Sequence, residues 1–346
     1  LEEHQLQNTV HLFTHEAGEK VKAGCFTVEF IHVNHSIADA VAFAIKTPVG
    51  TVVMTGDFKI DATAEDGMID LARFGALGKE GVLALLCDST NVERQGYTPS
   101  ERTVAGSFER QFTGCNKRII VTTFASNAFR LQSLITVAKK FGRKVAVTGR
   151  SMENILKVST ELGYLKIPAG TLVDINQIKQ IPNNKLVIVS TGSQGENMSA
   201  LYRMAFSGHR QVEITASDRV IISASAIPGN EKSIGKIINE LYRKGAEVIY
   251  DKLEGLHVSG HACQEELKII HGLTRPKFFI PVHGEQKHLH KHANLAKSMG
   301  MPPQNVLITD IGKVVEITPD KMEVTGAVPA GRVMVDGLGV GDVGSI

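Results

Sequence analysis

The sequence has few of the features that mark special classes of protein. Tryptophan is absent and aromatic residues make up only 5% of the chain, which disfavours a broad platform for stacking nucleic-acid bases. No apolar run approaches the ~18–20 residues of a membrane-spanning helix, and no signal peptide is visible, so we expect no membrane partner. The 38 basic and 36 acidic residues nearly cancel, which restricts any nucleic-acid binding to a local groove.

Cysteine is scarce, and the four cysteines show neither a CxxC pair nor a regular spacing. They are Cys25, Cys87, Cys115 and Cys263. This usage predicts reduced thiols in a cytoplasmic protein rather than a disulfide framework. The remaining composition, with 42% hydrophobic and 21% charged residues, is that of an ordinary globular chain. At 346 residues the chain can bury a large core and, at roughly 150 residues per domain, should contain about two domains.

The order of the predicted elements indicates one domain interrupted by another. Strand-length, β-branched runs occupy residues 26–31, 42–45, 51–54 and 82–87. Strands at 118–122, 144–148, 185–190, 219–223 and 247–250 then alternate with helical patterns at 126–141, 151–162, 196–206 and 231–244. This alternation predicts βαβ units on a parallel sheet. A helix at 263–271, a strand at 277–281, a helix at 285–299 and strands at 305–308 and 313–317 follow.

Both ends of the sequence look like the interior of a longer protein. The first residue is Leu1 rather than methionine, and residues 1–4 are typical of the inside of a helix. The last residues, 337–346, form a Gly- and Val-rich segment that resembles a strand. We therefore expect the sequence to be a piece of a larger chain.

Three side chains that commonly bind metal ions follow predicted strands. They are His35, Asp57 and His283, and glycines at 56 and 284 would let the backbone approach closely. Functional sites of α/β sheets collect beyond the carboxyl ends of strands, so these residues are candidate metal ligands. The alternative for each is a structural role as a helix cap or turn residue.

A denser group of polar residues occupies positions 257–262, with the sequence His-Val-Ser-Gly-His-Ala, before a predicted helix. Backbone N–H groups, the Ser259 hydroxyl and imidazole donors would together suit a phosphate. The alternative is an ordinary helix cap formed by Ser259, with His257 and His261 on the surface.

The predicted parallel sheet repeats one kind of junction between strand and helix. Small hydroxyl residues and glycines gather at 122–127, 148–151, 190–196 and 223–229. Such residues at helix starts favour anions, but none of the junctions is a Walker A loop or a GxGxxG motif. Capping alone would also explain them.

The run His288-Leu289-His290-Lys291-His292 resembles a metal motif but lies within a helical pattern. At helical spacing only His288 and His292 share a face. We therefore predict a solvated basic helix face, near which RNA or DNA would lie.

The order of these motifs resembles the ribonuclease J family, which is part of the β-CASP group of the metallo-β-lactamase superfamily. The motifs are Asn34–Ser36, Thr55–Lys59, Cys87–Asn91, Ser190–Glu196, His257–Ala262 and Pro281–Glu285. The combination of the HSxxD-like start at 35–39, GDFK at 56–59 and PVHGE at 281–285 is specific. The resemblance covers the chain from about residue 20 to 346.

The resemblance implies an α/β fold of two parts. A metallo-β-lactamase αββα sandwich, with its N-terminal part missing, would be formed by segments 1–101 and 257–346. A β-CASP α/β domain on a parallel sheet would be inserted at 102–256.

The resemblance also implies roles for individual residues. Two divalent metal ions, zinc or manganese, would be held by His35 on one ion, Asp57 between the ions and His283 on the second. Asp88 would orient ligands or assist proton transfer, and His261 would stabilise the charged phosphorane or protonate the leaving oxygen. A substrate phosphate would be bound by His257, Val258, Ser259, Gly260 and His261, with Ser193 and Gln194 nearby on the insert.

The implied function is hydrolysis of RNA phosphodiester bonds in RNA processing and decay, in the cytoplasm. The family acts as a 5′→3′ exonuclease that favours 5′-monophosphate ends and also as an endonuclease, as a homodimer or homotetramer. One alternative is an RNA-binding module without hydrolysis. Another is a metallo-β-lactamase-fold hydrolase of small esters or thioesters, against which the large 102–256 insert argues.

Two features of the family are absent from this sequence. The HxHxDH motif should precede His35, but the histidines before that residue do not match it, and the small C-terminal domain does not follow Ile346. The chain keeps three of the expected metal ligands. We therefore predict weak or absent metal binding and little activity unless another segment restores the motif.

Overall fold

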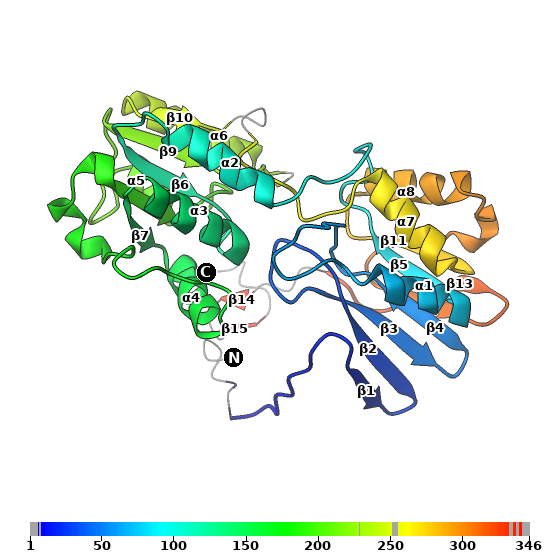
Figure 1. The fold of residues 1–346 in the computed structure, drawn as a ribbon. Coiled ribbons are helices and arrows are strands. Elements are labelled where there is room, and N and C mark those ends of the chain that lie inside the picture. Colours follow the sequence, from blue (N-terminus) through cyan, green and yellow to red (C-terminus); the bar gives the residue numbers. More distant parts are fainter. Residues whose placement is uncertain are drawn as a thin grey trace.

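The computed structural model describes residue 6, residues 8–227, 229–250 and 255–331, and the backbone of residues 335–336 and 339–340. These residues form two lobes, each built around one β-sheet (Figure 1). The mixed architecture with parallel strands confirms the predicted α/β fold class. Within the described residues, no helix combines the length and the apolarity needed to cross a bilayer.

The first sheet contains six strands in the order β1-β2-β3-β4-β5-β11. Its strands are β1 (Lys20–Ala23), β2 (Phe26–His32), β3 (Val41–Thr47), β4 (Gly50–Met54), β5 (Ala84–Asp88) and β11 (Phe278–Val282). Strands β1 to β4 form an antiparallel meander, whereas β5 runs parallel to β4 and β11 runs parallel to β5. A strand from late in the sequence thus completes a sheet that begins near its start.

Helices and a hairpin cover this sheet. The helices are α1 (Leu71–Glu80), α7 (Gln264–Thr274) and α8 (Gln286–Ser298), and the hairpin is β12 (Lys313–Ile317) with β13 (Met322–Ala327). The apolar faces of the three helices share one core with the sheet, in which Phe74 and Leu267 pack with Val53 and Phe279. This core fixes the strand ends that carry the candidate site.

The second sheet contains five parallel strands in the order β10-β9-β6-β8-β7. They are β6 (Arg118–Thr122), β7 (Lys144–Thr148), β8 (Leu186–Ser190), β9 (Asp218–Ile222) and β10 (Glu247–Ile249). The helices are α2 (Arg102–Phe112), α3 (Ala128–Lys140), α4 (Arg150–Glu161), α5 (Ala200–Ala205) and α6 (Glu231–Arg243). All of them lie inside the predicted insert, whose exact boundaries at 102 and 256 remain a prediction.

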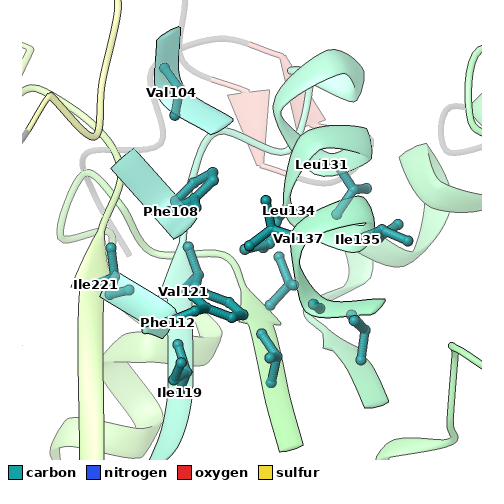
Figure 2. Packing of buried hydrophobic residues seen from close by; sticks show 14 of the residues in the cluster. Val104, Phe108, Phe112, Ile119, Val121, Leu131, Leu134, Ile135, Val137 and Ile221 are labelled. Atoms are coloured by element: carbon teal, nitrogen blue, oxygen red, sulfur yellow. The ribbon is translucent and has the colours of Figure 1, made fainter. Parts of the chain in front are cut away.

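Helices on both faces explain why the strands of this sheet are apolar along their whole length. Figure 2 shows Phe108 and Phe112 of α2 and Leu134 of α3 packed with Ile119 and Val121 of β6. A separate apolar cluster, which includes residues of α5 and α6, packs against the same sheet.

The helix predicted at 196–206 is shorter in the structure. Gly195 and Met198 have φ angles of 75° and 65°, which a right-handed helix does not accept. The Ser199 side chain then caps α5 by accepting a hydrogen bond from the backbone N–H of Tyr202.

The prediction of a strand at 305–308 is wrong. Residues Pro303–Asn305 form a short 3₁₀-helix, and Val306 makes a single bridge to Phe279. The sequence patterns also do not predict α1, α2, β1 or β13. The helical pattern at 1–4 lies outside the described residues, as does most of 337–346, where the backbone of β15 (Gly339–Val340) pairs with β14 (Val335–Asp336).

The prediction of a solvated face on α8 is wrong for two of its histidines. His288 and His292 are 8% and 0% exposed, because α8 packs this side against β11. His292 Nδ1 lies 2.9 Å from the Ser89 hydroxyl, and its Nε2 lies 3.4 Å from Nε2 of buried His271. Because Ser89 follows Asp88, this buried imidazole pair supports the turn that carries a candidate site residue.

Gly78 of α1 lies where this helix packs on α7. A Cβ here would lie 1.9 Å from the backbone oxygen of Leu273, whereas a Cβ at Gly106 of α2 would meet nothing within 4 Å. We expect Gly78→Ala to lower the free energy of unfolding by about 1–3 kcal/mol, because the two helices must separate. Gly106→Ala should raise it by about 0.5–1 kcal/mol through helix propensity. Urea unfolding of both variants measures these changes in the free energy of unfolding. If both substitutions stabilised the protein, the predicted close packing at Gly78 would be contradicted.

The buried imidazoles predict a loss of stability in acid. Burial lowers the pKa of His271 to about 4 and that of His292 to about 3, against about 6.5 in an unfolded chain. At pH values between the folded and the unfolded pKa, these imidazoles are protonated in the unfolded chain but not in the folded chain. The free energy of unfolding therefore falls as the pH falls. We expect a loss of roughly 2 kcal/mol per imidazole between pH 7 and pH 5.

Urea unfolding at the two pH values measures this loss. His271→Gln, which cannot titrate, should show a smaller difference between pH 7 and pH 5 than the parent. His290→Gln is the matched control, because His290 is an exposed residue of α8. Equal pH dependence of the parent and His271→Gln would show that the buried pair is not responsible.

Candidate active site

The first sheet brings the predicted strand-end residues to one edge. Asp57 follows β4, Asp88 ends β5 and His283 follows β11, and these three strands are parallel neighbours. The register pairs Val282 with Asp88, the last residue of β5, so that His283 lies beside the end of β5. Parallel strands therefore place these side chains side by side although they are far apart in the sequence.

Two carboxylates and two imidazoles meet at this edge. Ligand atoms of Asp57, Asp88, His261 and His283 all lie within 4.8 Å of one another. His283 Nδ1 lies 3.3 Å from Asp57 Oδ1 and 3.2 Å from Asp88 Oδ1, and His261 Nδ1 lies 2.7 Å from Asp88 Oδ2. The structure therefore joins two residues predicted as ligands with two predicted as catalytic groups.

His35 adjoins this cluster through Asp57 and His261. Its Nδ1 donates to the carbonyl of Gly260 at 2.9 Å, and its Nε2 lies 3.8 Å from Asp57 Oδ2. Its ring centroid lies 5.0 Å from that of His261. A Cβ at Gly260 would lie 2.5 Å from His35 Nδ1, so only glycine permits this approach.

Asp88 is the buried centre of the cluster, and its side chain is 1% exposed. Burial raises the pKa of its carboxyl, but hydrogen bonds from His261 and His283 outweigh burial and hold this pKa well below its usual range. Thr90 adds a hydroxyl donor to Asp88 Oδ1 at 2.7 Å. Asp88 is therefore an anion that orients two imidazoles.

His283 has a strained backbone and a shifted pKa. Its φ angle is 56°, in the left-handed region that residues other than glycine rarely adopt. The hydrogen bond to Asp88 raises the pKa of His283, while burial opposes this effect. Burial lowers the pKa of His35. The pKa values of the two imidazoles are thus shifted in opposite directions although both face Asp57.

The segment 257–263 is held by side chains that follow β5. The Asn91 side-chain amide donates to Ser259 Oγ and to the His261 carbonyl, each at 2.8 Å, and the Thr98 hydroxyl donates to the same carbonyl at 2.7 Å. No sequence pattern predicts a role for either residue. Asn91 ends the motif at 87–91, which is the only signal that pointed toward it.

The residues predicted to bind phosphate fall into different environments. Ser259 and His257 are half-buried, whereas the Val258 side chain is buried in the apolar core of the second lobe. Ser193 is buried as well. The buried amide of Gln194 donates to the carbonyl of Ser225 at 2.9 Å and accepts from the N–H of Ile227 at 2.8 Å. The phosphate-binding roles of all these residues stay predictions.

A cavity of about 440 Å³ adjoins the site. Its lining comes from residues 94–99 after β5, from 222–225 at the end of β9, from Tyr250, and from 256–259 with Cys263. The cavity therefore lies between elements of both lobes, next to the segment 257–263.

The donor set fits a divalent metal ion. Carboxylate oxygens and imidazole nitrogens suit zinc and manganese, and four such groups converge within ligand-to-ligand distances. His35, predicted as a ligand, lies beside this group, with its Nε2 facing Asp57. The number and identity of the ions, and which residue binds which ion, remain predictions.

Two family models match the chain. The model for the ribonuclease J β-CASP domain matches residues 116–241, which include most of the second sheet. The model for the Zn-dependent metallo-hydrolase RNA specificity domain matches residues 246–308, which include His261 and His283.

Curated relatives match most of the chain at high identity. Ribonuclease J of Thermus thermophilus is 47% identical, over 92% of this chain and 56% of its own length. Ribonuclease J of Synechocystis is 45% identical, over 98% of this chain and 53% of its own length. Ribonuclease J 1 of Streptococcus pyogenes is 43% identical, over 100% and 62%. The chain thus spans about half the length of the curated relatives it matches.

A solved structure supports the fold independently. The crystal structure of a protein of unknown function from Enterococcus faecalis V583 matches with a TM-score of 0.57 at 16% identity, over 91% of this chain and 68% of that chain. At this identity the match concerns the fold alone. The family models and the curated relatives carry the assignment: over the part of those relatives that it spans, the chain belongs to the ribonuclease J family.

Proposed function

We propose that this chain carries the RNA-cleaving centre of a metal-dependent ribonuclease, which hydrolyses phosphodiester bonds in RNA processing and decay. The convergence of Asp57, Asp88, His261 and His283 at one sheet edge carries the proposal. The ribonuclease J names of the relatives support RNA as the substrate. Exonuclease action from 5′-monophosphate ends, together with endonuclease action, is the mode that we infer.

Asp57 is suited to lie between two metal ions. Its Oδ2 lies 3.8 Å from His35 Nε2, and its Oδ1 lies 3.3 Å from His283 Nδ1. Each carboxylate oxygen therefore faces a different imidazole. We assign His35 to one zinc or manganese ion, His283 to the second, and Asp57 to both. Bound metal would supply Lewis acidity and lower the pKa of an attacking water.

Asp88 and His261 are suited to move a proton. Asp88 accepts from Nδ1–H of His261, which leaves Nε2 as the nitrogen that exchanges a proton with substrate. A protonated His261 would stabilise charge that grows on the phosphate or protonate the leaving oxygen.

The segment 257–261 is suited to bind the phosphate of RNA. Ser259 contributes a hydroxyl and Gly260 lets the backbone approach His35 closely. We assign binding of the substrate phosphate to this segment, with Ser193 and Gln194 acting from the second lobe. All four cysteines are free thiols, which supports action in the reducing cytoplasm.

Replacement of Asp57 should weaken metal binding. We expect Asp57→Asn to lower the affinity for Zn²⁺ or Mn²⁺ at least about tenfold, because an amide lacks the charge of the carboxylate. Competition with a coloured chelator measures the affinity, on this chain and on the chain extended upstream with the HxHxDH segment of a ribonuclease J. Asp320→Asn is the control, because this side chain is 97% exposed. Equal affinities of Asp57→Asn and the parent would contradict the assignment.

Replacement of His261 should abolish most cleavage. We expect His261→Gln, in the upstream-extended chain with Mn²⁺ or Zn²⁺, to slow cleavage of 5′-monophosphorylated RNA by about 10²–10⁴-fold. His290→Gln should cleave like the parent, because His290 is exposed on α8. Unchanged cleavage by His261→Gln would refute the catalytic role. A salt-sensitive gel shift without product from the parent would instead favour an RNA-binding module.

A further inference from the structure

Arg130 of α3 is a buried charge in the second lobe, and it is 1% exposed. A buried guanidinium is costly unless charge and hydrogen bonds compensate for lost water. The Glu101 carboxylate accepts from Arg130 Nε at 2.7 Å and from Nη2 at 2.8 Å, in a two-point pair. This pair ties α3 to the start of α2.

The remaining N–H groups of Arg130 point to the end of β9 and to the phosphate-binding segment. Nη1 donates to the Ser223 carbonyl at 3.0 Å and to His257 Nδ1 at 2.9 Å, and Nη2 donates to the Val258 carbonyl at 3.2 Å. A guanidinium has five N–H donors. Two of them bond to Glu101, and the three contacts just described use the other three. Arg130 is therefore saturated by acceptors from three separate parts of the chain.

The contact with His257 determines a tautomer. A guanidinium has no acceptor, so His257 Nδ1 must be the acceptor and carries no hydrogen. The imidazole is consequently neutral, and its hydrogen resides on Nε2. A hydrogen-bond donor at this atom is the kind of group that a phosphate oxygen accepts.

The same contacts hold the backbone that leads into the catalytic histidine. Ser223 Oγ donates to the Leu256 carbonyl at 2.5 Å, and Arg130 donates to the Val258 carbonyl two residues later. Ser259, Gly260 and His261 follow directly. Arg130 and Ser223 of the second lobe thus hold this segment in addition to Asn91 and Thr98.

We propose that Arg130 is a positioning residue for the RNA phosphate: it holds His257 as the neutral Nε2–H tautomer and fixes segment 257–261 in its binding position. The inference rests on the proposed function for its meaning in RNA binding. The tautomer itself does not depend on that function.

The first test measures the tautomer. In protein labelled with ¹⁵N-histidine, the His257 nitrogen signals are identified by their loss in His257→Gln. At neutral pH we expect an Nδ1 without hydrogen and a protonated Nε2 in the parent. We expect a mixture of tautomers, or the charged form, in Arg130→Met and Arg130→Lys. An Nδ1–H form or a charged ring in the parent would overturn the proposal, and this outcome needs no variant to fold.

The second test measures RNA binding. The apparent Kd for a 5′-monophosphorylated RNA oligonucleotide should rise at least fivefold in Arg130→Met and less in Arg130→Lys. The matched control is Arg118→Met, because Arg118 forms a similar two-point pair with buried Asp218, at 2.7 and 2.8 Å, at the start of β6. Arg118→Met should leave the His257 signals and the Kd unchanged.

The outcomes separate this proposal from the proposed function. Unchanged His257 signals in a folded Arg130→Lys, or an equal effect of Arg118→Met, would overturn the positioning role. If the parent binds no RNA, the proposed function fails and the role of Arg130 in RNA binding fails with it. The tautomer measurement would in that case still decide whether Arg130 controls His257.

Discussion

The parallel pairing of β11 with β5 is the constraint on which the candidate site depends. It aligns Val282 with Asp88 and so places His283 against a carboxylate from a distant part of the chain. The pairing is stable because Phe279 of β11 enters the core beneath α7 and α8, where strand hydrogen bonds and apolar burial act together. A shift of one residue would turn Phe279 out of this core and move His283 away from Asp88.

Two unfavourable effects at the sheet edge are offset by hydrogen bonds and packing. Asp88 is buried, which by itself disfavours its charge, and His283 has a backbone conformation that costs free energy. Hydrogen bonds from His261 and His283 keep the carboxylate ionised, and buried His292 supports the turn through Ser89. Such opposed effects are typical of sites in which a rigid core holds reactive groups in place.

Polar contacts join the two lobes near the site. Arg130 reaches from α3 to His257 and Val258, while Asn91 reaches from the first lobe to Ser259 and His261. The segment 257–261 is therefore shared, and neither lobe determines its position alone. Hydrogen bonds have strict geometry, so the placement of His261 is linked to that of the second lobe through this segment.

The sequence by itself determined which residue types stand at the strand ends and where strands and helices alternate, because these patterns repeat over a few neighbouring residues. Asp57, His283 and the 257–262 motif, and the parallel sheet of the second lobe, were visible in this way. Other features depend on partners from remote segments: the buried side of α8 and the contacts of Asn91 and Arg130. Local periodicity cannot say which helix face turns inward or which distant carbonyl a buried arginine will find, because both are decided only when the core closes and every buried polar group needs a partner.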